Sequence, residues 1–200
     1  MIITLASLKG GSGKTTSATA LAYYFATRRP KLRVVLADGD PNRTVIDWAN
    51  SSKSSLPFVV TSADSEQPEH DIIIFDTAAR TSDEDLSELI EASNLLIIPT
   101  RLDIYDIRTT IALAQTLENT PEKYRILLTG IPPRGKRLFN EALVMFNDVG
   151  LKSFDSGIRY LTVYRDAAFQ GTPIAMYSNA GKKAFKDYQL IGKTIQEGWM

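Results

Sequence analysis

The chain has 200 residues, 44% of them hydrophobic, which is enough for one folded domain over residues 1–200 with a buried core. Basic and acidic residues balance at 23 each, so the chain has no overall attraction for nucleic acid, and any such binding must rest on a local basic surface. There is no cysteine, no apolar run of about 18 residues and no signal-peptide pattern, which excludes disulfides and favours a cytoplasmic protein with no membrane partner.

Apolar runs alternate with helical patterns along the whole chain. The predicted strands lie near residues 2–7, 34–38, 58–61, 72–76, 94–99, 125–130 and 154–158. The predicted helices lie near residues 15–28, 43–51, 83–92, 106–118, 137–148, 161–169 and 179–196. Such alternation is typical of the α/β class and predicts a mostly parallel, twisted sheet with helices on both faces.

The first predicted strand runs directly into a glycine-rich loop. The loop comprises Lys9, Gly10, Gly11, Ser12, Gly13, Lys14, Thr15 and Thr16. Its glycines let consecutive backbone amides point inward at the start of the next helix, which suits a nucleotide phosphate. Lys14 can reach the β and γ phosphates, and the Thr15 hydroxyl can coordinate Mg²⁺. These residues predict a P-loop nucleotide site, to which Lys9 adds a second lysine.

The strand near residues 34–38 ends in the sequence Asp38-Gly39-Asp40-Pro41-Asn42. Side chains two residues apart on a strand point to the same face, and the carboxyl ends of parallel strands border the ligand crevice. Glycine, proline, aspartate and asparagine are also turn residues, so the motif alone fits a plain turn equally well. Its position about one strand–helix unit after the glycine-rich loop favours a catalytic role.

The apolar strand near residues 72–76 ends in a third candidate carboxylate, Asp76. This is the Walker B pattern, in which the carboxylate holds a magnesium-bound water near the loop threonine, here Thr15. An apolar run followed by one aspartate is common, and taken alone it fits a strand-end turn better. Because it follows the two other motifs in order, it predicts a metal site at Thr15 and Asp76.

With Lys9 at the start of the loop and these motifs in this order, the chain resembles the ParA/MinD family of deviant Walker A ATPases. The resemblance is strongest to the small ParA-like partition proteins and covers nearly the whole chain. It implies ATP and Mg²⁺ as cofactors and an ATP-sandwich dimer in which Lys9 reaches the phosphates of the partner. The alternative for Lys9 is a surface lysine beside an ordinary P-loop. The absence of cysteine excludes the iron–sulfur and metalloid-handling branches of the superfamily.

The resemblance also implies a role for each carboxylate. Asp38 would support Mg²⁺ through water, and Asp40 would position the attacking water. The implied catalytic residues are Lys9, Lys14 and Asp40. The implied metal-site residues are Thr15, Asp38 and Asp76.

Three further segments carry the resemblance. Residues 77–80 match a mobile segment that senses the γ phosphate. The polar residues 101–106, after a strand that ends in Pro99, correspond to a segment close to the dimer contact. Residues 169–174 resemble a segment that passes near the adenine, which implies a nucleotide contact at Pro173.

Basic residues gather in the last fifty positions of the chain. They are Arg159, Arg165, Lys182, Lys183, Lys186 and Lys193. Lys182, Lys186 and Lys193 are spaced to share roughly one helical face, where cations could neutralise DNA phosphates without reading bases. A solvated helix face is the alternative, and the resemblance favours nonspecific binding to nucleoid DNA.

The resemblance implies a cytoplasmic, nucleoid-associated ATPase with weak, partner-stimulated hydrolysis. Its cargo would be a plasmid, a chromosome region or a protein assembly such as a carboxysome, and its partner a ParB-like centromere-binding or adaptor protein. A MinD-like membrane switch is an alternative, but the tail at residues 190–200 has two glycines and one lysine and fits a membrane-binding helix poorly. A metabolic P-loop enzyme would need a small-substrate pocket that no motif identifies.

Overall fold

The structure is a computed structural model that describes residues 1–79, 83–117 and 119–200. Within these residues six strands form one sheet in which all neighbouring strands are parallel. The strands are β1 (Ile2–Ser7), β2 (Val34–Gly39), β3 (Val59–Ser62), β4 (Ile72–Ala79), β5 (Leu95–Arg101) and β6 (Tyr124–Thr129). Their order is β3-β2-β4-β1-β5-β6, which places the first strand between β4 and β5 inside the sheet.

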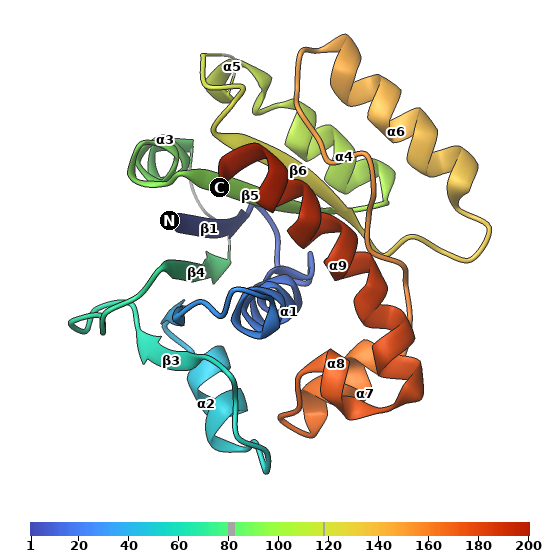
Figure 1. The fold of residues 1–200 in the computed structure, drawn as a ribbon. Coiled ribbons are helices and arrows are strands. Elements are labelled where there is room, and N and C mark those ends of the chain that lie inside the picture. The colour runs from blue at the N-terminus through green and yellow to red at the C-terminus, as the bar shows by residue number, and fades with distance from the viewer. Residues whose placement is uncertain (80–82, 118) are drawn as a thin grey trace.

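Helices cover both faces of the sheet (Figure 1). One face carries α1 (Lys14–Thr27), α2 (Thr44–Asn50), α7 (Val163–Phe169), α8 (Ile174–Tyr177) and α9 (Asn179–Trp199). The other face carries α3 (Asp83–Ala92), α4 (Ile104–Ile111), α5 (Ala114–Leu117) and α6 (Lys136–Asp148).

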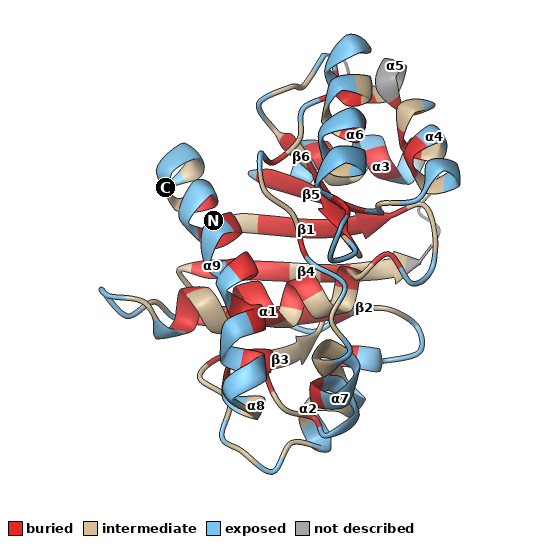
Figure 2. Cartoon of the chain, turned by 90° about the vertical axis from the view of Figure 1, so that its right-hand side faces the viewer, coloured by how far each residue is buried: buried red, intermediate tan, exposed pale blue. Residues whose placement is uncertain are grey.

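The strands read as continuous apolar runs because both faces of each central strand are buried. In β5, Leu95 and Ile97 join the apolar cluster with α1 and α9, whereas Leu96 and Ile98 join the cluster with α3 to α6. Figure 2 shows the same arrangement, with buried strands in the middle and exposed outer helix faces. The buried sheet fixes the positions of the strand ends, where the polar motifs lie.

The predicted α/β class and the parallel sheet are confirmed, but the seventh predicted strand is wrong. This segment runs beside β6, where the amides of Phe154 and Ile158 donate to the carbonyls of Ile126 and Leu128. The bridges that flank it, Ile126 with Ser153 and Ile131 with Arg159, are isolated. The backbone at Gly157 approaches so closely that a Cβ there would lie 2.6 Å from the carbonyl oxygen of Leu128. The segment therefore lies close to β6 without forming a regular ladder of strand hydrogen bonds.

The helical prediction also differs from the structure in two places. The helix predicted over residues 106–118 is divided into α4 and α5 by a turn at residues 112–113, where Leu113 donates to the carbonyl of Thr110 three residues back. The short helix α8 was not predicted. It is a single turn that follows Pro173, and hydrophobic periodicity does not detect so short an element.

Candidate nucleotide site

The glycine-rich loop joins the end of β1 to the start of α1. Gly11 and Gly13 adopt positive φ angles of 76° and 93°, a region that residues with a side chain rarely enter. A Cβ built on Gly10 or Gly11 would meet no atom within 4 Å, so the outer side of the loop is open. Helix α1 begins without a side-chain cap and without an acidic residue in its first turn. Its free amide donors and its positive end are therefore available to a phosphate.

The hydroxyl of Ser12 is a buried polar atom within this loop. Among the described residues it has no hydrogen-bond partner. Its side chain belongs to the lining of the cavity that adjoins the loop. Buried hydroxyls are rarely left unpaired, so an oxygen-rich ligand in the loop would supply a missing interaction.

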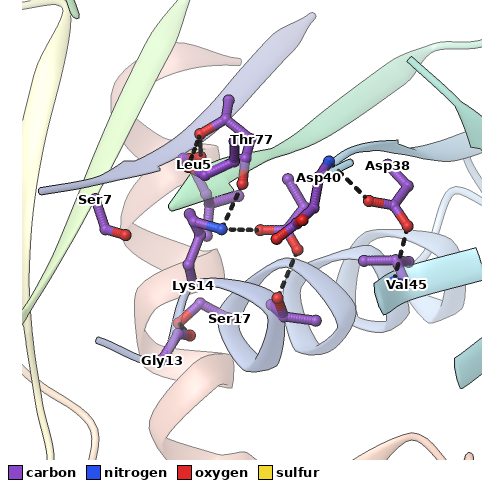
Figure 3. Close-up of polar contacts among 12 residues, drawn as sticks. Leu5, Ser7, Gly13, Lys14, Ser17, Asp38, Asp40, Val45 and Thr77 are labelled. Atoms are coloured by element: carbon purple, nitrogen blue, oxygen red, sulfur yellow. Dashed lines mark hydrogen bonds and ion pairs between the residues drawn. The ribbon is translucent and has the colours of Figure 1, made fainter. Parts of the chain in front are cut away.

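Lys14, Thr15 and Asp76 form a polar cluster in which Lys14 and Asp76 are buried and Thr15 is half-buried. Figure 3 shows the Lys14 ammonium directed at the Thr77 carbonyl. The Lys14 ammonium lies 3.3 Å from Asp76 Oδ1 and also donates to the Thr77 carbonyl. The Thr15 hydroxyl donates to Asp76 Oδ2 at 2.6 Å. Burial raises the pKa of the Asp76 carboxyl, and Lys14 and Thr15 oppose that rise by stabilising its charged form. The structure thus brings Thr15 and Asp76 together, the two residues predicted to share a metal site.

This cluster suits Mg²⁺, which takes part of its coordination shell from water and phosphate, better than a metal ion whose ligands all come from the protein. Mg²⁺ prefers oxygen ligands and usually takes one or two carboxylates or hydroxyls from the protein, with water and phosphate completing its shell. Thr15 and Asp76 supply such a pair at the helix start. Across the described parts of the chain, no group of three or more histidine, cysteine or acidic side chains could hold a metal ion.

Asp38 and Asp40 lie at the end of β2, where the strand gives way to a turn. Asp38 is 4% exposed, and its carboxylate accepts hydrogen bonds from the backbone amides of Asp40, Val45 and Ile46 at 2.8–3.0 Å. Asp40 is half-buried, and its Oδ1 accepts from the amide and the side chain of Asn42, both at 2.9 Å. Because β2 ends at Gly39, the two-residue alternation of a strand no longer relates these carboxylates.

Lys9 makes an ion pair within its own chain. Its ammonium lies 2.9 Å from Oδ1 of Asp106 on α4, and the two side chains are 42% and 16% exposed. Asp106 closes the polar segment at residues 101–106 that the sequence associated with a dimer contact. The structure thus brings these two predicted elements together, although they are 97 positions apart.

A cavity of about 370 Å³ opens beside the glycine-rich loop. Its walls come from the ends of β5 and β6 and from residues 158–165, which include Arg101, Thr129, Tyr160 and Arg165. Its size and its position next to a phosphate cradle suit the base and sugar of a nucleotide. The sequence analysis assigned none of these residues to the nucleotide, since it gave Arg165 to DNA and Arg101 to the dimer contact, although strand ends at one edge of a parallel sheet are the expected place for a ligand.

Pro173 is not among the residues that line this cavity. It precedes α8, and its neighbours Thr172 and Ile174 line a smaller cavity of about 40 Å³ that reaches Thr15 and Thr16. Thr77 donates to the Leu5 carbonyl at 2.9 Å, which joins β4 to β1. Arg80, at the end of the predicted phosphate-sensing segment, lies outside the described residues.

The six basic residues predicted to bind DNA differ in their surroundings. Arg159 is held by Asp187 through its Nε at 2.9 Å and its Nη2 at 2.9 Å, and Arg165 lines the large cavity. On α9, Lys182, Lys183 and Lys186 are exposed, and Lys193 pairs with Glu197 at 3.5 Å. Three further exposed basic residues, which the sequence analysis did not select, lie around the start of α6. They are Arg134, Lys136 and Arg137.

Comparisons with known proteins agree with this geometry. A family model described as an AAA domain matches residues 1–151. The chain is 26% identical over 210 residues to the maintenance of carboxysome distribution protein A of Gloeobacter kilaueensis, with 99% of this chain and 95% of that protein covered.

Two solved structures have the same fold. One is a putative plasmid partition protein of Borrelia burgdorferi bound to AMPPNP, with 17% identity, a TM-score of 0.70 and 98% of each chain covered. The other is the MinC:MinD cell division protein complex of Aquifex aeolicus, with 16% identity, a TM-score of 0.74 and coverage of 98% and 95%. In the described part of the chain, no helix has the length and apolar character needed to cross a membrane.

Proposed function

The chain belongs to the AAA-domain family, as a ParA/MinD-like ATPase, and we propose that it binds ATP with Mg²⁺, dimerises around the nucleotide and hydrolyses it slowly. The observation that carries the proposal is the hydrogen-bonded cluster of Lys14, Thr15 and Asp76 next to an open glycine loop. The nearby cavity would hold the base and sugar, with its contacts at Arg101, Tyr160 and Arg165 rather than at Pro173.

In the proposed reaction each polar residue has one task. Lys14 would leave Asp76 and the Thr77 carbonyl and donate to the β and γ phosphates, and Thr15 and Asp76 would hold the metal. Bound Mg²⁺ would neutralise charge on the phosphate oxygens. Asp40 orients a water for in-line attack on the γ phosphorus, and the products are ADP and phosphate.

Dimerisation is proposed to depend on Lys9. A second cation supplied to the triphosphate by the partner subunit couples ATP binding to association, because ADP carries less charge to attract it. Among the described residues, the Lys9 ammonium is held by a partly exposed ion pair with Asp106, from which it can be withdrawn at small cost.

We propose that the ATP-bound dimer binds nucleoid DNA nonspecifically and positions a cargo through a small adaptor protein. The alignment with a carboxysome distribution protein covers 99% of this chain at 26% identity. It favours a protein assembly as cargo, with a plasmid or chromosome region as the alternative. A membrane-switch function is less consistent with the fold, because Ile191 and Ile195 on the last helix are fully buried in the core.

The test of this function is the oligomeric state in each nucleotide. We expect wild type to be monomeric with ADP and dimeric with ATP and Mg²⁺, and we expect Lys9→Ala to bind nucleotide yet neither dimerise nor hydrolyse it. Light scattering and phosphate release at matched protein concentration measure both. Lys31→Ala is the control, because Lys31 is exposed and precedes β2, at the opposite end of the strands from the loop. A stable ATP dimer of Lys9→Ala would contradict the proposed role.

A further inference from the structure

A single buried side chain holds both ends of the turn between β2 and α2. Asp38 Oδ1 accepts from the amide of Asp40 at 3.0 Å, where the turn begins. Asp38 Oδ2 accepts from the amides of Val45 at 2.8 Å and Ile46 at 3.0 Å, in the first turn of α2. Charged acceptors form strong hydrogen bonds with helix-start amides, so Asp38 fixes where the turn starts and where the helix begins.

The turn needs such support because its backbone is strained. Arg43, the residue before α2, has a φ of 51°, in the left-handed region that costs free energy for a residue with a side chain. Its amide donates to the Asp40 carbonyl at 2.8 Å, which closes the turn. A strained backbone persists only where the surrounding contacts determine it, and the three bonds to Asp38 are such contacts.

Within the turn, Asn42 fixes the carboxylate of Asp40. Its backbone amide and its side-chain amide both donate to Asp40 Oδ1, each at 2.9 Å. With one oxygen held by two donors, the carboxylate has a defined orientation, and Oδ2 is the oxygen left to direct towards a water.

We infer that Asp38 and Asn42 are positioning residues that aim the Asp40 carboxylate for ATP hydrolysis, an inference that rests on the proposed function of Asp40. A carboxylate has about four lone-pair sites, and backbone amides take three of those on Asp38. Three of the roughly four acceptor sites thus serve the turn, which makes the turn the main contact of Asp38 in this structure. This differs from the role in supporting Mg²⁺ that the family resemblance implies for it.

The competing interpretation has a structural basis that the experiment must address. Asp38 on β2 is in register with Asp76 on β4, next to the proposed metal position. If Asp38 supported Mg²⁺, its loss would change the Mg²⁺ concentration needed for activity. If it positions Asp40, its loss would change the maximal rate and leave the Mg²⁺ requirement unaltered.

The test measures kcat, the KM for ATP and the Mg²⁺ concentration at half-maximal rate. A hydrogen bond to a charged group is worth about 1.5–3 kcal/mol, so we expect Asp38→Asn to lower kcat about tenfold or more, and Asn42→Ala to lower it severalfold. In both variants the half-maximal Mg²⁺ concentration should stay within about twofold of wild type, whereas Thr15→Ala should raise it clearly. Asp47→Asn is the matched control, since Asp47 is an exposed acid in the same helix.

Amide hydrogen exchange supplies a readout that does not depend on activity. Asp38→Asn should speed exchange at Asp40, Val45 and Ile46, and Asn42→Ala, which removes an exposed side chain, should fold normally and leave Val45 and Ile46 protected. A raised Mg²⁺ requirement in Asp38→Asn, or protection unchanged at these amides, would overturn the inference.

Failure of the inference can be told apart from failure of the proposed function. If Asp40→Asn abolishes turnover while Asp38→Asn and Asn42→Ala keep the wild-type kcat, the positioning role alone is wrong. If Asp40→Asn retains normal turnover, both the role of Asp40 and the positioning role are wrong. Loss of turnover in Asp40→Asn together with a lowered kcat in Asp38→Asn and Asn42→Ala, the Mg²⁺ requirement of the latter two being unchanged, supports both.

Discussion

At the scale of single residues, the ion pair between Lys9 and Asp106 would compete with the contact to a second subunit that we propose for Lys9. The pair is short, at 2.9 Å, but Lys9 is 42% exposed, and exposed ion pairs contribute about 0.2–1 kcal/mol. A contact of this size orients Lys9 in the monomer without locking it there. A triphosphate presented by a second subunit offers far more negative charge, so the nucleotide can draw Lys9 away.

We therefore expect Asp106→Asn to favour the ATP dimer. Removing a contact worth up to 1 kcal/mol from the monomer would tighten dimerisation by up to about fivefold. The measurement is the dimer dissociation constant with ATP and Mg²⁺ by analytical ultracentrifugation. Asp148→Asn, which removes an exposed acid at the end of α6, controls for the change in net charge. A weaker dimer in Asp106→Asn would mean that Asp106 itself contributes to the interface.

At the scale of elements, the contact between α9 and α1 holds the C-terminal helix against the nucleotide-binding half of the sheet. The contact is close because Gly192 faces the ring of Tyr24, where a Cβ would lie 2.3 Å from Cδ1. Ser17 on α1 also shares a hydrogen bond of 3.0 Å with the buried Tyr188 hydroxyl. The helix that starts at the phosphate loop is thus fixed by the last helix of the chain.

Gly192→Ala should therefore destabilise the protein, although alanine favours helices. Crowding a packed contact costs about 1–3 kcal/mol, which exceeds the gain of about 1 kcal/mol in helix propensity. The comparison is Gly198→Ala on the same helix, where a Cβ meets nothing within 4 Å and stability should rise slightly. Urea unfolding of both variants measures the difference, and greater stability in Gly192→Ala would show that Tyr24 moves aside at little cost.

At the scale of the whole molecule, charge is distributed so that only local surfaces can attract DNA. The net charge is zero, and Arg159, one of the candidate DNA-binding residues, is committed to Asp187. The exposed lysines near the start of α9 are better placed, because they are not part of the nucleotide cavity. DNA binding would thus belong to one side of the molecule and would respond strongly to salt.

We expect Lys182→Ala combined with Lys186→Ala to weaken DNA binding equally on unrelated sequences. Each lost phosphate contact lowers the slope of log affinity against log salt by about 0.9, so the double variant should lose about 1.8. Fluorescence anisotropy with ATP and Mg²⁺ at several salt concentrations measures the slope. The control is Lys31→Ala with Lys53→Ala, which removes the same charge from exposed positions outside α9. Equal slopes for the two double variants would assign the α9 lysines to solvation alone.

The sequence by itself determined the features that depend on contiguous residues. The apolar runs of the six strands, the glycines of the loop and the aspartate that closes β4 are each encoded within a few positions. Periodicity and backbone freedom act over that range. The parallel sheet then follows from the alternation of strands and helices, and it brings Asp76 to Thr15 as expected.

Only the tertiary structure decided which residues the polar side chains pair with through hydrogen bonds and ion pairs. Lys9 pairs with Asp106, 97 positions away, and Arg159 pairs with Asp187, 28 positions away. The carboxylate of Asp38, at the end of β2, accepts hydrogen bonds from amides of α2. Likewise, the segment at residues 154–158 lies beside β6 between two isolated bridges in place of the predicted strand. The periodicity of hydrophobic residues along the chain does not predict these contacts, because each depends on where two elements distant in sequence pack together. A polar group that is buried there must form hydrogen bonds with the donors or acceptors beside it.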